Sequence, residues 1–340
     1  MNSNKPVTLK TIADILGIKP ATVSKALRDE SDVSEATKER VKKTAARMGY
    51  RPNLIARSLR QQRTFAIGAI VPEITTSFHS LVIRGFYQKA RERGYEVFLM
   101  ISDENAANER RSLEYLASFP VDGIAISLSQ ETTDVTFLKR LHDQGMPIVF
   151  YDRAWEGLNL SSVTIDDRKA AFEMVEYLIQ TGRRRIAYLG PTEIPIIAKR
   201  RYKGYKEALQ YVDSGNYQEL IVPCKIDDKA GYHALKEVLE QNIEIDAVFC
   251  FNDLVALGAG RAILEKNLTI PEDVALAGFG DNVETALLGE PITTVNQFPF
   301  EMGQKAIEIL IDEIESKKQG RFLPPKQIVL KSQLVIRSST

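Results

Sequence analysis

The sequence is poor in the residues that mark secreted, metal-binding or membrane proteins. Its 340 residues include only two cysteines, Cys224 and Cys250, and three scattered histidines, without a CxxC or HExxH motif. We therefore expect no disulfide framework, no metal site and no cofactor. No apolar run approaches the roughly 18 residues of a membrane-spanning helix, and the N-terminus lacks the apolar stretch of a signal peptide. These absences predict a soluble cytoplasmic protein that does not bind membranes.

Net charge is also lacking, because 45 Lys and Arg balance 45 Asp and Glu. The balance hides a separation. Residues 1–63 contain 14 basic and six acidic residues, a net charge of +8, and the other 277 residues contain 31 and 39, a net charge of -8. Since Lys and Arg neutralise phosphates, a basic arm on an acidic body indicates a module that binds a polyanion, although a solvated basic surface is the plainer alternative.

Beyond residue 63, short apolar runs alternate with amphipathic stretches of helical length, which is typical of βα repetition. The predicted strands are 65–71, 95–101, 123–127, 147–151, 162–165, 186–189, 219–223, 247–251, 274–278 and a final strand at 327–336. The predicted helices are 80–93, 107–118, 133–143, 169–180, 198–211, 229–240, 253–266 and 300–317. The fold class is therefore α/β, with two doubly wound parallel sheets.

The first 50 residues are expected to be all-helical. Thr8 can cap a first helix that ends at Gly17, Pro20 suits the first turn of a second helix, and Ser34 can cap a third. The apolar stripe of the first helix comprises Ile12, Ile15 and Leu16. Three short helices with a tight turn between the first two predict a helix-turn-helix module.

Residues 8–60, TLKTIADILGIKPATVSKALRDESDVSEATKERVKKTAARMGYRPNLIARSLR, resemble the DNA-binding headpiece of the lactose-repressor (LacI/GalR) family of bacterial transcription regulators. The resemblance continues through IGAIVP, RRIAYLG, FNDLVALG, VALAGF, TTV and VIRSST. It implies a headpiece at 1–50, a hinge helix at 51–63 and a periplasmic-binding-protein-like core at 64–340. Within that core, one lobe comprises about 64–163 and 294–322, and the other about 164–293 and 323–340.

The same resemblance implies a sequence-specific repressor of carbohydrate-utilisation genes. Such a protein is a homodimer on a pseudo-palindromic double-stranded operator, with an allosteric, sugar-like effector between the core lobes. Family members use effectors either to release DNA or to strengthen its binding. An enzymatic activity is not expected.

The second helix of the headpiece is the predicted reader of the major groove. Lys25 can donate to guanine, whereas Pro20 and Ala21 offer small apolar contacts, and the family reads bases at these three positions. A phosphate contact is the alternative for Lys25. The expected backbone contacts are Thr8, Thr22, Ser24, Arg28 and Asn53.

Residues 51–60 resemble the hinge helix of the family, in which a leucine wedges into a base step from the minor groove beside an alanine. Here these positions are Leu59 and Ala56. Unstacking the bases costs a few kcal/mol, which the bent duplex returns as further contacts. An ordinary linker is the alternative.

Effector contacts are expected after the carboxyl ends of strands, where open parallel sheets bind ligands. The resemblance implies seven positions: Phe78, Asp152, Arg153, Arg201, Asn252, Asp281 and Gln297. A helix cap or a surface ion pair is the alternative for Asp152, Arg201 and Asn252, and Asp253 suits a cap better than a ligand contact. Gly280 and Ile226 stand where relatives often carry an acidic and an aromatic residue, so we expect an altered sugar site. Arg153 and Arg201 also suit an anionic ligand.

Two rival functions share parts of this pattern. A sugar-binding transport receptor has the same core, but the missing signal peptide and the basic helical headpiece, with its net charge of +8, argue against it. A dinucleotide-dependent enzyme is suggested by Gly278-Phe-Gly280, yet Val283 occupies the third glycine position. We therefore favour the regulator.

Overall fold

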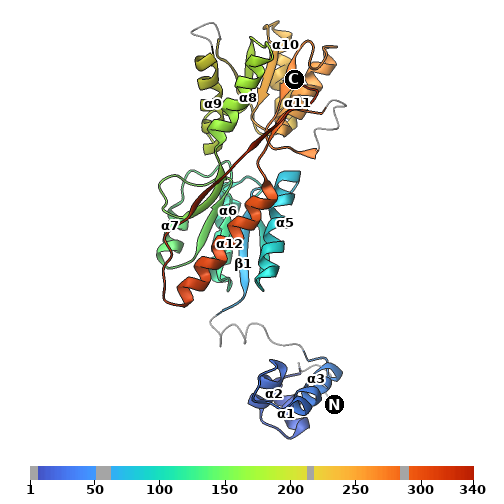
Figure 1. The fold of residues 1–340 in the computed structure, drawn as a ribbon, viewed down its shortest axis with the longest axis vertical. Helices are drawn as coiled ribbons and strands as arrows, with labels where there is room; N and C mark the ends of the chain where they lie inside the picture. Colours follow the sequence, from blue (N-terminus) through green and yellow to red (C-terminus); the bar gives the residue numbers. More distant parts are fainter. Residues whose placement is uncertain (1–6, 51–62, 213–217, 284–290) are drawn as a thin grey trace. The chain divides into compact units, whose positions relative to one another are not determined.

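The computed structural model describes residues 7–50, 63–212, 218–283 and 291–340 (Figure 1). The chain divides into two units, residues 1–64 and 65–340. Separate hydrophobic clusters lie in each unit. The predicted hinge, with Asn53, Ala56 and Leu59, lies almost entirely outside the described residues.

The first unit contains the three predicted helices, α1 (Leu9–Leu16), α2 (Pro20–Leu27) and α3 (Glu35–Arg47). Thr8 caps α1 through a capping box with Thr11. Gly17 ends α1 in the left-handed region, at a φ of 65°, where a side chain would be strained. Pro20 is the first residue of α2, as predicted.

Two details of the headpiece differ from the prediction. Ile15 is 51% exposed, because the buried side of α1 is centred on Ile12, Ala13 and Leu16, and Ile15 is rotated away from it. Ser34 occupies the N-cap position of α3, but its hydroxyl bonds to the hydroxyl of Thr37 at 2.9 Å and makes no side-chain bond to the helix backbone.

A six-stranded sheet forms the centre of what we term lobe one. Its strand order is β11-β5-β4-β3-β1-β2 and its pairs are parallel. The strands are β1 (Ala66–Val71), β2 (Glu96–Ile101), β3 (Gly123–Ile126), β4 (Ile148–Tyr151), β5 (Ser161–Ile165) and β11 (Gln327–Leu330). The helices are α5 (Ser77–Glu92), α6 (Ala106–Ser118), α7 (Thr136–Asp143) and α12 (Pro299–Lys318).

Both faces of this sheet are covered. Along β1, Ile67 and Val71 enter the cluster under α5 and α12, whereas Ala66 and Ile70 enter the cluster under α6 and α7. Alternate residues of a strand point to opposite faces, so a strand covered on both sides is apolar throughout. This explains the uninterrupted apolar run at 65–71.

A four-stranded parallel sheet forms the centre of lobe two, in the order β7-β6-β8-β9. The strands are β6 (Ile186–Leu189), β7 (Leu220–Val222), β8 (Ala247–Cys250) and β9 (Ala275–Ala277). The helices are α8 (Asp167–Gln180), α9 (Ile196–Val212), α10 (Asp228–Glu240) and α11 (Asp253–Glu265). Helices α8 and α9 pack together, as do α10 and α11.

The end of the chain corrects one prediction. The single strand expected at 327–336 is two strands, β11 and β12 (Gln333–Val335), separated by Lys331 and Ser332. β11 pairs with β5 in lobe one, while β12 pairs antiparallel with β10 (Thr294–Asn296). Assigning all of 323–340 to lobe two is therefore wrong for β11, because this strand is part of the lobe-one sheet before the chain crosses over (Figure 1).

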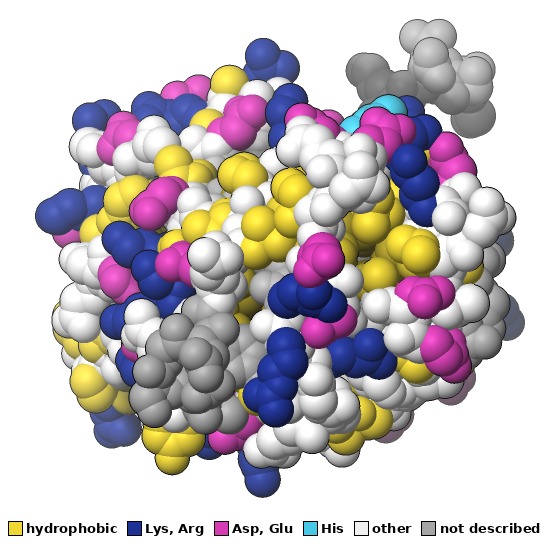
Figure 2. All heavy atoms as spheres, turned by 90° about the horizontal axis from the view of Figure 1, so that it is seen from above, with side chains coloured by type: hydrophobic (Ala, Val, Ile, Leu, Met, Phe, Trp, Pro, Cys, Tyr) yellow, Lys and Arg dark blue, Asp and Glu magenta, His cyan; other side chains and the backbone are white. Residues whose placement is uncertain are grey.

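The described chain passes between the lobes three times: from β5 to α8, from β10 to α12, and from β11 to β12 (Figure 1). On the face shown in Figure 2, the Lys and Arg side chains of the described residues are intermixed with Asp and Glu. Such mixing does not form the concentrated basic surface that binds DNA. Among the described helices, none is both long and apolar enough to cross a bilayer.

Candidate functional site

A cavity of about 270 Å³ lies between the two lobes. Six of the seven predicted effector residues line it: Phe78, Asp152, Arg153, Arg201, Asn252 and Gln297. Ile226 and Gly280, the two departures from the family pattern, line it as well. The structure thus brings together residues that are up to 219 positions apart in the chain.

The parallel sheets explain this convergence. Phe78 follows β1, Asp152 and Arg153 follow β4, and Asn252 follows β8, each beyond the carboxyl end of its strand. In both sheets this edge faces the cavity, as expected for ligand sites of doubly wound sheets. The backbone at Asp152 adopts the left-handed region, at a φ of 56°, so the chain turns sharply directly after β4.

Arg153 is buried beside a carboxylate of the same lobe. Its Nη1 donates to Glu104 Oε2 at 2.7 Å and to the carbonyl of Leu128 at 3.2 Å. Burial disfavours the charge on Glu104, but the guanidinium outweighs this and lowers the pKa of Glu104. The charge of Arg153 is therefore matched within the protein.

Arg201 lies in the second turn of α9 and, like Arg153, forms an ion pair with a carboxylate of its own lobe. Its Nε donates to Asp167 Oδ1 at 2.8 Å, and its Nη1 donates to the carbonyl of Phe251 at 2.7 Å. The guanidinium stacks over the ring of Phe279, 3.6 Å from the centroid. The ion pair with Asp167 is buried, which removes the surface-pair alternative for this residue.

Asp152 is different, because its buried carboxylate makes no hydrogen bond among the described residues. The nearest cation is Arg153, whose Nε lies 3.7 Å from Asp152 Oδ2. Burial raises the pKa of Asp152 to about 6, against the opposing effect of Arg153. A buried carboxylate that lines a cavity and has no hydrogen-bond donor from the described residues can accept hydrogen bonds from a ligand.

Asn252 contributes both a cap and a cavity wall. Its Oδ1 accepts from the backbone N–H of Val255 at 3.0 Å and caps α11, so the cap alternative is present. Its side chain also lines the cavity. Asp253 was the residue expected to cap; it is instead the first residue of α11, and its carboxylate accepts from Thr294 Oγ1 and from the backbone of Asn282, both at 2.7 Å.

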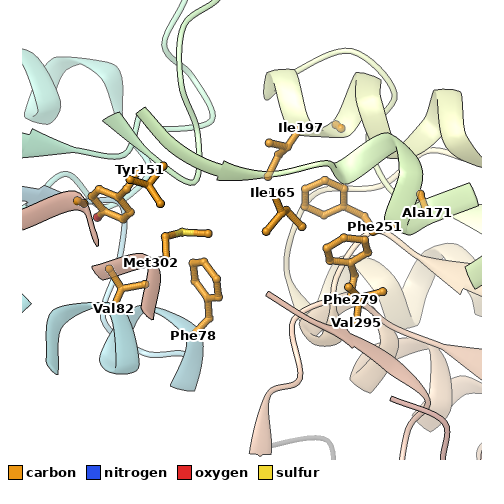
Figure 3. Packing of buried hydrophobic residues seen from close by; sticks show 14 of the residues in the cluster. Phe78, Val82, Tyr151, Ile165, Ala171, Ile197, Phe251, Phe279, Val295 and Met302 are labelled. Atoms are coloured by element: carbon orange, nitrogen blue, oxygen red, sulfur yellow. The ribbon is translucent and has the colours of Figure 1, made fainter. Parts of the chain in front are cut away.

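Aromatic rings provide the apolar part of the cavity. Phe251 and Phe279 lie on the lobe-two side, and Phe78 lies on the lobe-one side (Figure 3). All three belong to one hydrophobic cluster that includes residues of both lobes. Aromatic faces next to a carboxylate that can accept hydrogen bonds suit a ligand with both hydroxyl groups and C–H surfaces.

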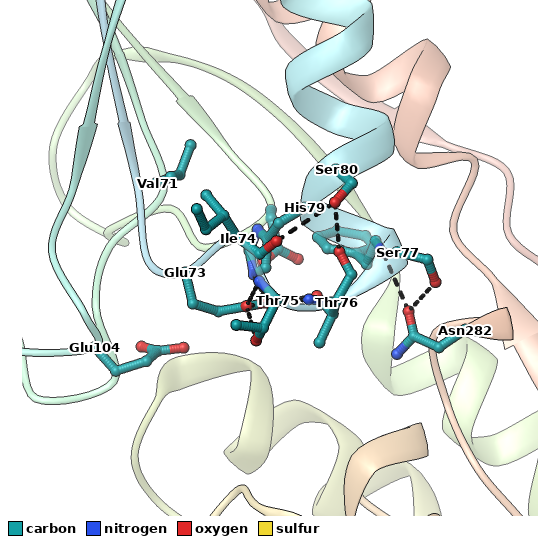
Figure 4. A network of polar contacts seen from close by, with 12 residues as sticks. Val71, Glu73, Ile74, Thr75, Thr76, Ser77, His79, Ser80, Glu104 and Asn282 are labelled. Atoms are coloured by element: carbon teal, nitrogen blue, oxygen red, sulfur yellow. Dashed lines mark hydrogen bonds and ion pairs between the residues drawn. The ribbon is translucent and has the colours of Figure 1, made fainter. Parts of the chain in front are cut away.

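Further polar residues surround the floor of the cavity. His79 is buried with Nε2 3.5 Å from Glu73 Oε1, and burial lowers its pKa to about 4 (Figure 4). Its Nδ1 and the Oε1 of Gln297 have no hydrogen-bond partner among the described residues. A neutral imidazole and an amide thus complete the polar lining.

Asp281 is the predicted effector residue that the structure does not bring to the cavity. Its carboxylate pairs with Arg337 and accepts from Asn296 Nδ2 at 2.9 Å. The cause is the shift of the acidic residue by one position: Gly280 lines the cavity, and Asp281, at a φ of 58°, belongs to a different polar cluster.

Sequence reasoning missed several residues of the cavity. These are Glu73, Thr75, Thr76, His79, Glu104, Ile197, Asp227, Phe251, Leu254, Phe279 and Asn282. Phe251 is the last residue of the predicted strand 247–251, and Phe279 directly follows the predicted strand 274–278. Searching the carboxyl ends of predicted strands, as for Asn252, could therefore have found both. The loop after β2 carries Glu104, and its role as partner of Arg153 had no signal in the local sequence.

The pairing of the arginines bears on the ligand's charge. Arg153 is neutralised by Glu104 and Arg201 by Asp167, while Arg200 and Lys199 pair with Glu156 and Glu193. The cations that would bind the anionic ligand considered from the sequence are therefore already paired with carboxylates of the protein. The cavity favours a neutral ligand instead.

The second candidate site is the exposed side of α2. Pro20, Ala21 and Arg28 are exposed and Thr22 is half-buried, so these side chains are accessible. Lys25 pairs with Asp32, and the exposed fractions of the two side chains are 42% and 53%. An ion pair as exposed as this one contributes about 0–1 kcal/mol, so Lys25 can leave it for DNA at little cost.

Two predicted contacts have structural roles in the headpiece as well. Ser24 is buried and its hydroxyl accepts from Arg28 Nη1 at 2.8 Å. Thr8 caps α1. Asn53, Ala56 and Leu59 fall outside the described residues.

Comparison with known proteins identifies the family. A family model described as "Bacterial regulatory proteins, lacI family" matches residues 8–53. A second, described as "Periplasmic binding proteins and sugar binding domain of LacI family", matches residues 64–328, more than half of the chain. The chain belongs to the LacI family. The predicted fold class and family are confirmed, and the protein is a DNA-binding transcription regulator.

Relatives of similar length support the LacI-family assignment. The transcriptional regulator RegA of Clostridium saccharobutylicum is 33% identical over 98% of this chain and 99% of its own. The transcriptional repressor CytR of Escherichia coli (strain K12) is 31% identical over 100% of this chain and 99% of its own. The structure of the transcriptional regulator CelR in complex with cellobiose has 29% identity and a TM-score of 0.72, covering 98% of this chain and 100% of that chain.

Proposed function

We propose that this LacI-family chain represses carbohydrate-utilisation genes and is controlled by a small, neutral, sugar-like effector between its core lobes. The buried carboxylate of Asp152, which makes no hydrogen bond to the described residues, carries the proposal. It accepts hydroxyl donors of the effector, while Phe78, Phe251 and Phe279 provide aromatic faces for the C–H surface of a sugar ring. The complex of CelR with cellobiose supports this class of ligand.

The size of the cavity narrows the ligand. Its volume of about 270 Å³ lies at the small end of ligand pockets in proteins. A monosaccharide or nucleoside-sized ligand fits such a volume better than a long oligosaccharide does. Phe78, Asp152, Arg153, Arg201, Asn252 and Gln297 are the proposed contacts, with Arg153 and Arg201 orienting the neighbouring carboxylates and rings.

The proposed DNA-bound form is a cytoplasmic homodimer on a pseudo-palindromic operator, with one headpiece on each half-site. Pro20, Ala21 and Lys25 read bases, and Thr8, Thr22, Ser24, Arg28 and Asn53 contact the backbone. Leu59 and Ala56 of the hinge enter the minor groove at the operator centre. The protein acts by binding and not by catalysis, as its relatives RegA and CytR are regulators.

Effector binding changes operator affinity through the arrangement of the lobes. A ligand that contacts both lobes favours one relative arrangement, and that arrangement fixes how closely two hinges approach each other. Linkage requires the effector to bind the DNA-competent and DNA-incompetent states unequally.

A thermal-shift screen tests the effector class. Neutral monosaccharides and nucleosides are compared with sugar acids of the same size, since a ligand that binds only the native state raises the melting temperature. We expect stabilisation by a neutral ligand. Stabilisation by sugar acids alone would overturn the assignment of the cavity to neutral polyols.

A gel-shift titration tests DNA binding. The full chain is titrated against a palindromic operator drawn from its own promoter region and against a scrambled duplex of equal length. Specific binding should lose affinity steeply with salt, with a log–log slope of about -0.9 per neutralised phosphate. Equal affinity for both duplexes would contradict sequence-specific regulation.

A further inference from the structure

The N-terminus of α5 lacks a side-chain cap from its own lobe. Thr76 occupies the N-cap position but makes no capping hydrogen bond, because its hydroxyl donates to Glu73. The first N–H groups of a helix need acceptors that the helix itself does not provide. For the N–H of Phe78, in the first turn of α5, the acceptor is Asn282 Oδ1 at 3.1 Å (Figure 4).

Asn282 comes from the other lobe, in the loop that follows β9. Its Oδ1 also accepts from Ser77 Oγ at 3.0 Å, and the next residue, Val283, donates its backbone N–H to the same hydroxyl at 3.2 Å. Three hydrogen bonds therefore join the lobes at one point. Phe78 and Asn282 both line the cavity, so this point lies at the proposed effector site.

The loop that carries Asn282 is held firmly within lobe two. The backbone N–H of Asn282 donates to Asp253 Oδ2 at 2.7 Å, and Asp253 Oδ1 accepts from Thr294 Oγ1 at 2.7 Å. Asp253 is buried at the start of α11. A movement of lobe two relative to lobe one must therefore break the bonds of Asn282 to α5, because the loop cannot follow α5 independently.

We propose that Asn282 is a positioning residue of the effector site: it caps α5 from the opposite lobe and holds the lobes together before any effector binds. The effector then acts on an interface that is already partly closed, and Asn282 sets how often that closed arrangement is populated. A second contact between the lobes, Arg200 with Glu156 at 2.6 Å, is too exposed to have the same influence. The proposal deepens the proposed function, since it concerns the same cavity.

The first test measures the distance between the lobes without any ligand. Spin labels are placed at Lys139→Cys in lobe one and Glu244→Cys in lobe two, both exposed positions, with Cys224→Ser to remove the half-buried native thiol. Electron–electron distance measurement on the full chain should show that Asn282→Ala moves the distribution to longer distances. An unchanged distribution in a folded Asn282→Ala protein overturns the proposal.

The matched control is a cap within one lobe. Asn105 caps α6 by accepting from the N–H groups of Ala107 and Asn108, both at 3.0 Å. Asn105→Ala should destabilise the protein to a similar degree and leave the interlobe distance unchanged. If Asn282→Ala does not fold, Ser77→Ala is the replacement, since it removes the hydroxyl between Asn282 and Val283 and should shift the distance in the same direction by less.

The second test separates positioning from simple destabilisation by the sign of an effect. Loss of the hydrogen bonds between Asn282 and α5 favours the open arrangement of the lobes, whereas the effector favours the closed one. Without effector, the Asn282→Ala variant should therefore differ from the unmodified protein in operator affinity, in the direction opposite to the change that the effector causes. The expected size is about fivefold, because this is the equilibrium ratio that corresponds to the free energy of one helix cap. The probe is the neutral ligand with the largest shift in the thermal screen.

A change of the same sign as the effector's would overturn the proposal. If no neutral ligand binds, the effector assignment fails, and the distance measurement still decides the role of Asn282. The two hypotheses can thus fail separately.

Discussion

Two ion pairs between a cation and an aspartate differ in their exposure to solvent: Lys25–Asp32 in the headpiece and Arg201–Asp167 beside the cavity. The side chains of the first pair are 42% and 53% exposed, and those of the second are 3% and 2% exposed. An exposed pair is nearly neutral in free energy, whereas removing one partner of a buried pair leaves an uncompensated charge. The headpiece cation can exchange its carboxylate for DNA, while the cavity arginine stays in place as part of the site.

The largest expected effect comes from breaking the buried pair. Arg201→Ala leaves Asp167 buried without a cation and should lower the free energy of unfolding by about 3–5 kcal/mol. Urea unfolding followed by circular dichroism measures it. Arg200→Ala, one residue earlier on α9 with a mostly exposed partner, is the control and should change stability by less than about 0.5 kcal/mol. Equal losses in the free energy of unfolding at the two positions would show that burial does not make the Arg201–Asp167 pair more important for stability.

The cavity carboxylate of Asp152, which makes no hydrogen bond to the described residues, offers the next test. Asp152→Asn removes the charge but keeps the shape, and should weaken binding of the neutral effector by about 1.5–3 kcal/mol while operator affinity without effector is retained. Calorimetric titration measures the first and gel shift the second. Asp143→Ala, an exposed carboxylate on α7, is the control. Loss of DNA binding in Asp152→Asn would indicate a structural role.

The pH dependence of effector binding follows from the raised pKa of Asp152, about 6. Hydroxyl donors favour the charged form, so affinity should be constant above this pKa and fall as the pH drops through it, by up to about tenfold per unit. His79, with its pKa lowered to about 4, stays neutral in this window. Burial also raises the pKa of Asp253 to about 6. The Asp152→Asn variant separates these groups, because a pH dependence that persists in it belongs to another buried carboxyl whose pKa is raised, such as Asp253 or Asp167.

Local patterns in the sequence predicted the fold and the cavity to different degrees. Helix caps such as Thr8 and Gly17, and apolar runs such as 65–71, depend on neighbouring residues, and the structure confirms them. The path of the last 18 residues was not predictable in this way, because the apolar residues on both sides of Lys331 do not show that the chain changes lobes there.

The candidate site shows the same limit. Asp152 and Asn252 were found because each directly follows a strand, and the structure places both at the cavity. Asp281 was expected from the family resemblance and not from a position directly after a strand, and its carboxylate instead pairs with Arg337, 56 residues later in the chain. The pairing of Arg153 with Glu104 and the cap that Asn282 provides to α5 also join distant segments, so only the tertiary structure reveals them.

A smaller effect is expected on the headpiece side of the comparison. Lys25→Ala removes the predicted base contact and should reduce discrimination at one operator base pair by about 1–2 kcal/mol, since a good base contact contributes about this much. Gel shifts on operators substituted at each position measure it. Thr22→Ala, a predicted backbone contact, should weaken all operators equally. A uniform loss in Lys25→Ala would instead support the phosphate-contact alternative.

The smallest expected effect concerns the partner of Lys25. Asp32→Ala breaks an exposed ion pair and should change the free energy of unfolding of the headpiece by no more than about 1 kcal/mol. Operator affinity should rise modestly for two reasons. Lys25 no longer has to break an ion pair before it binds DNA, and one negative charge near the phosphates is lost. Thermal unfolding and gel shift measure the two quantities on the same protein. A stability loss as large as that of Arg201→Ala would show that exposure does not separate the two ion pairs.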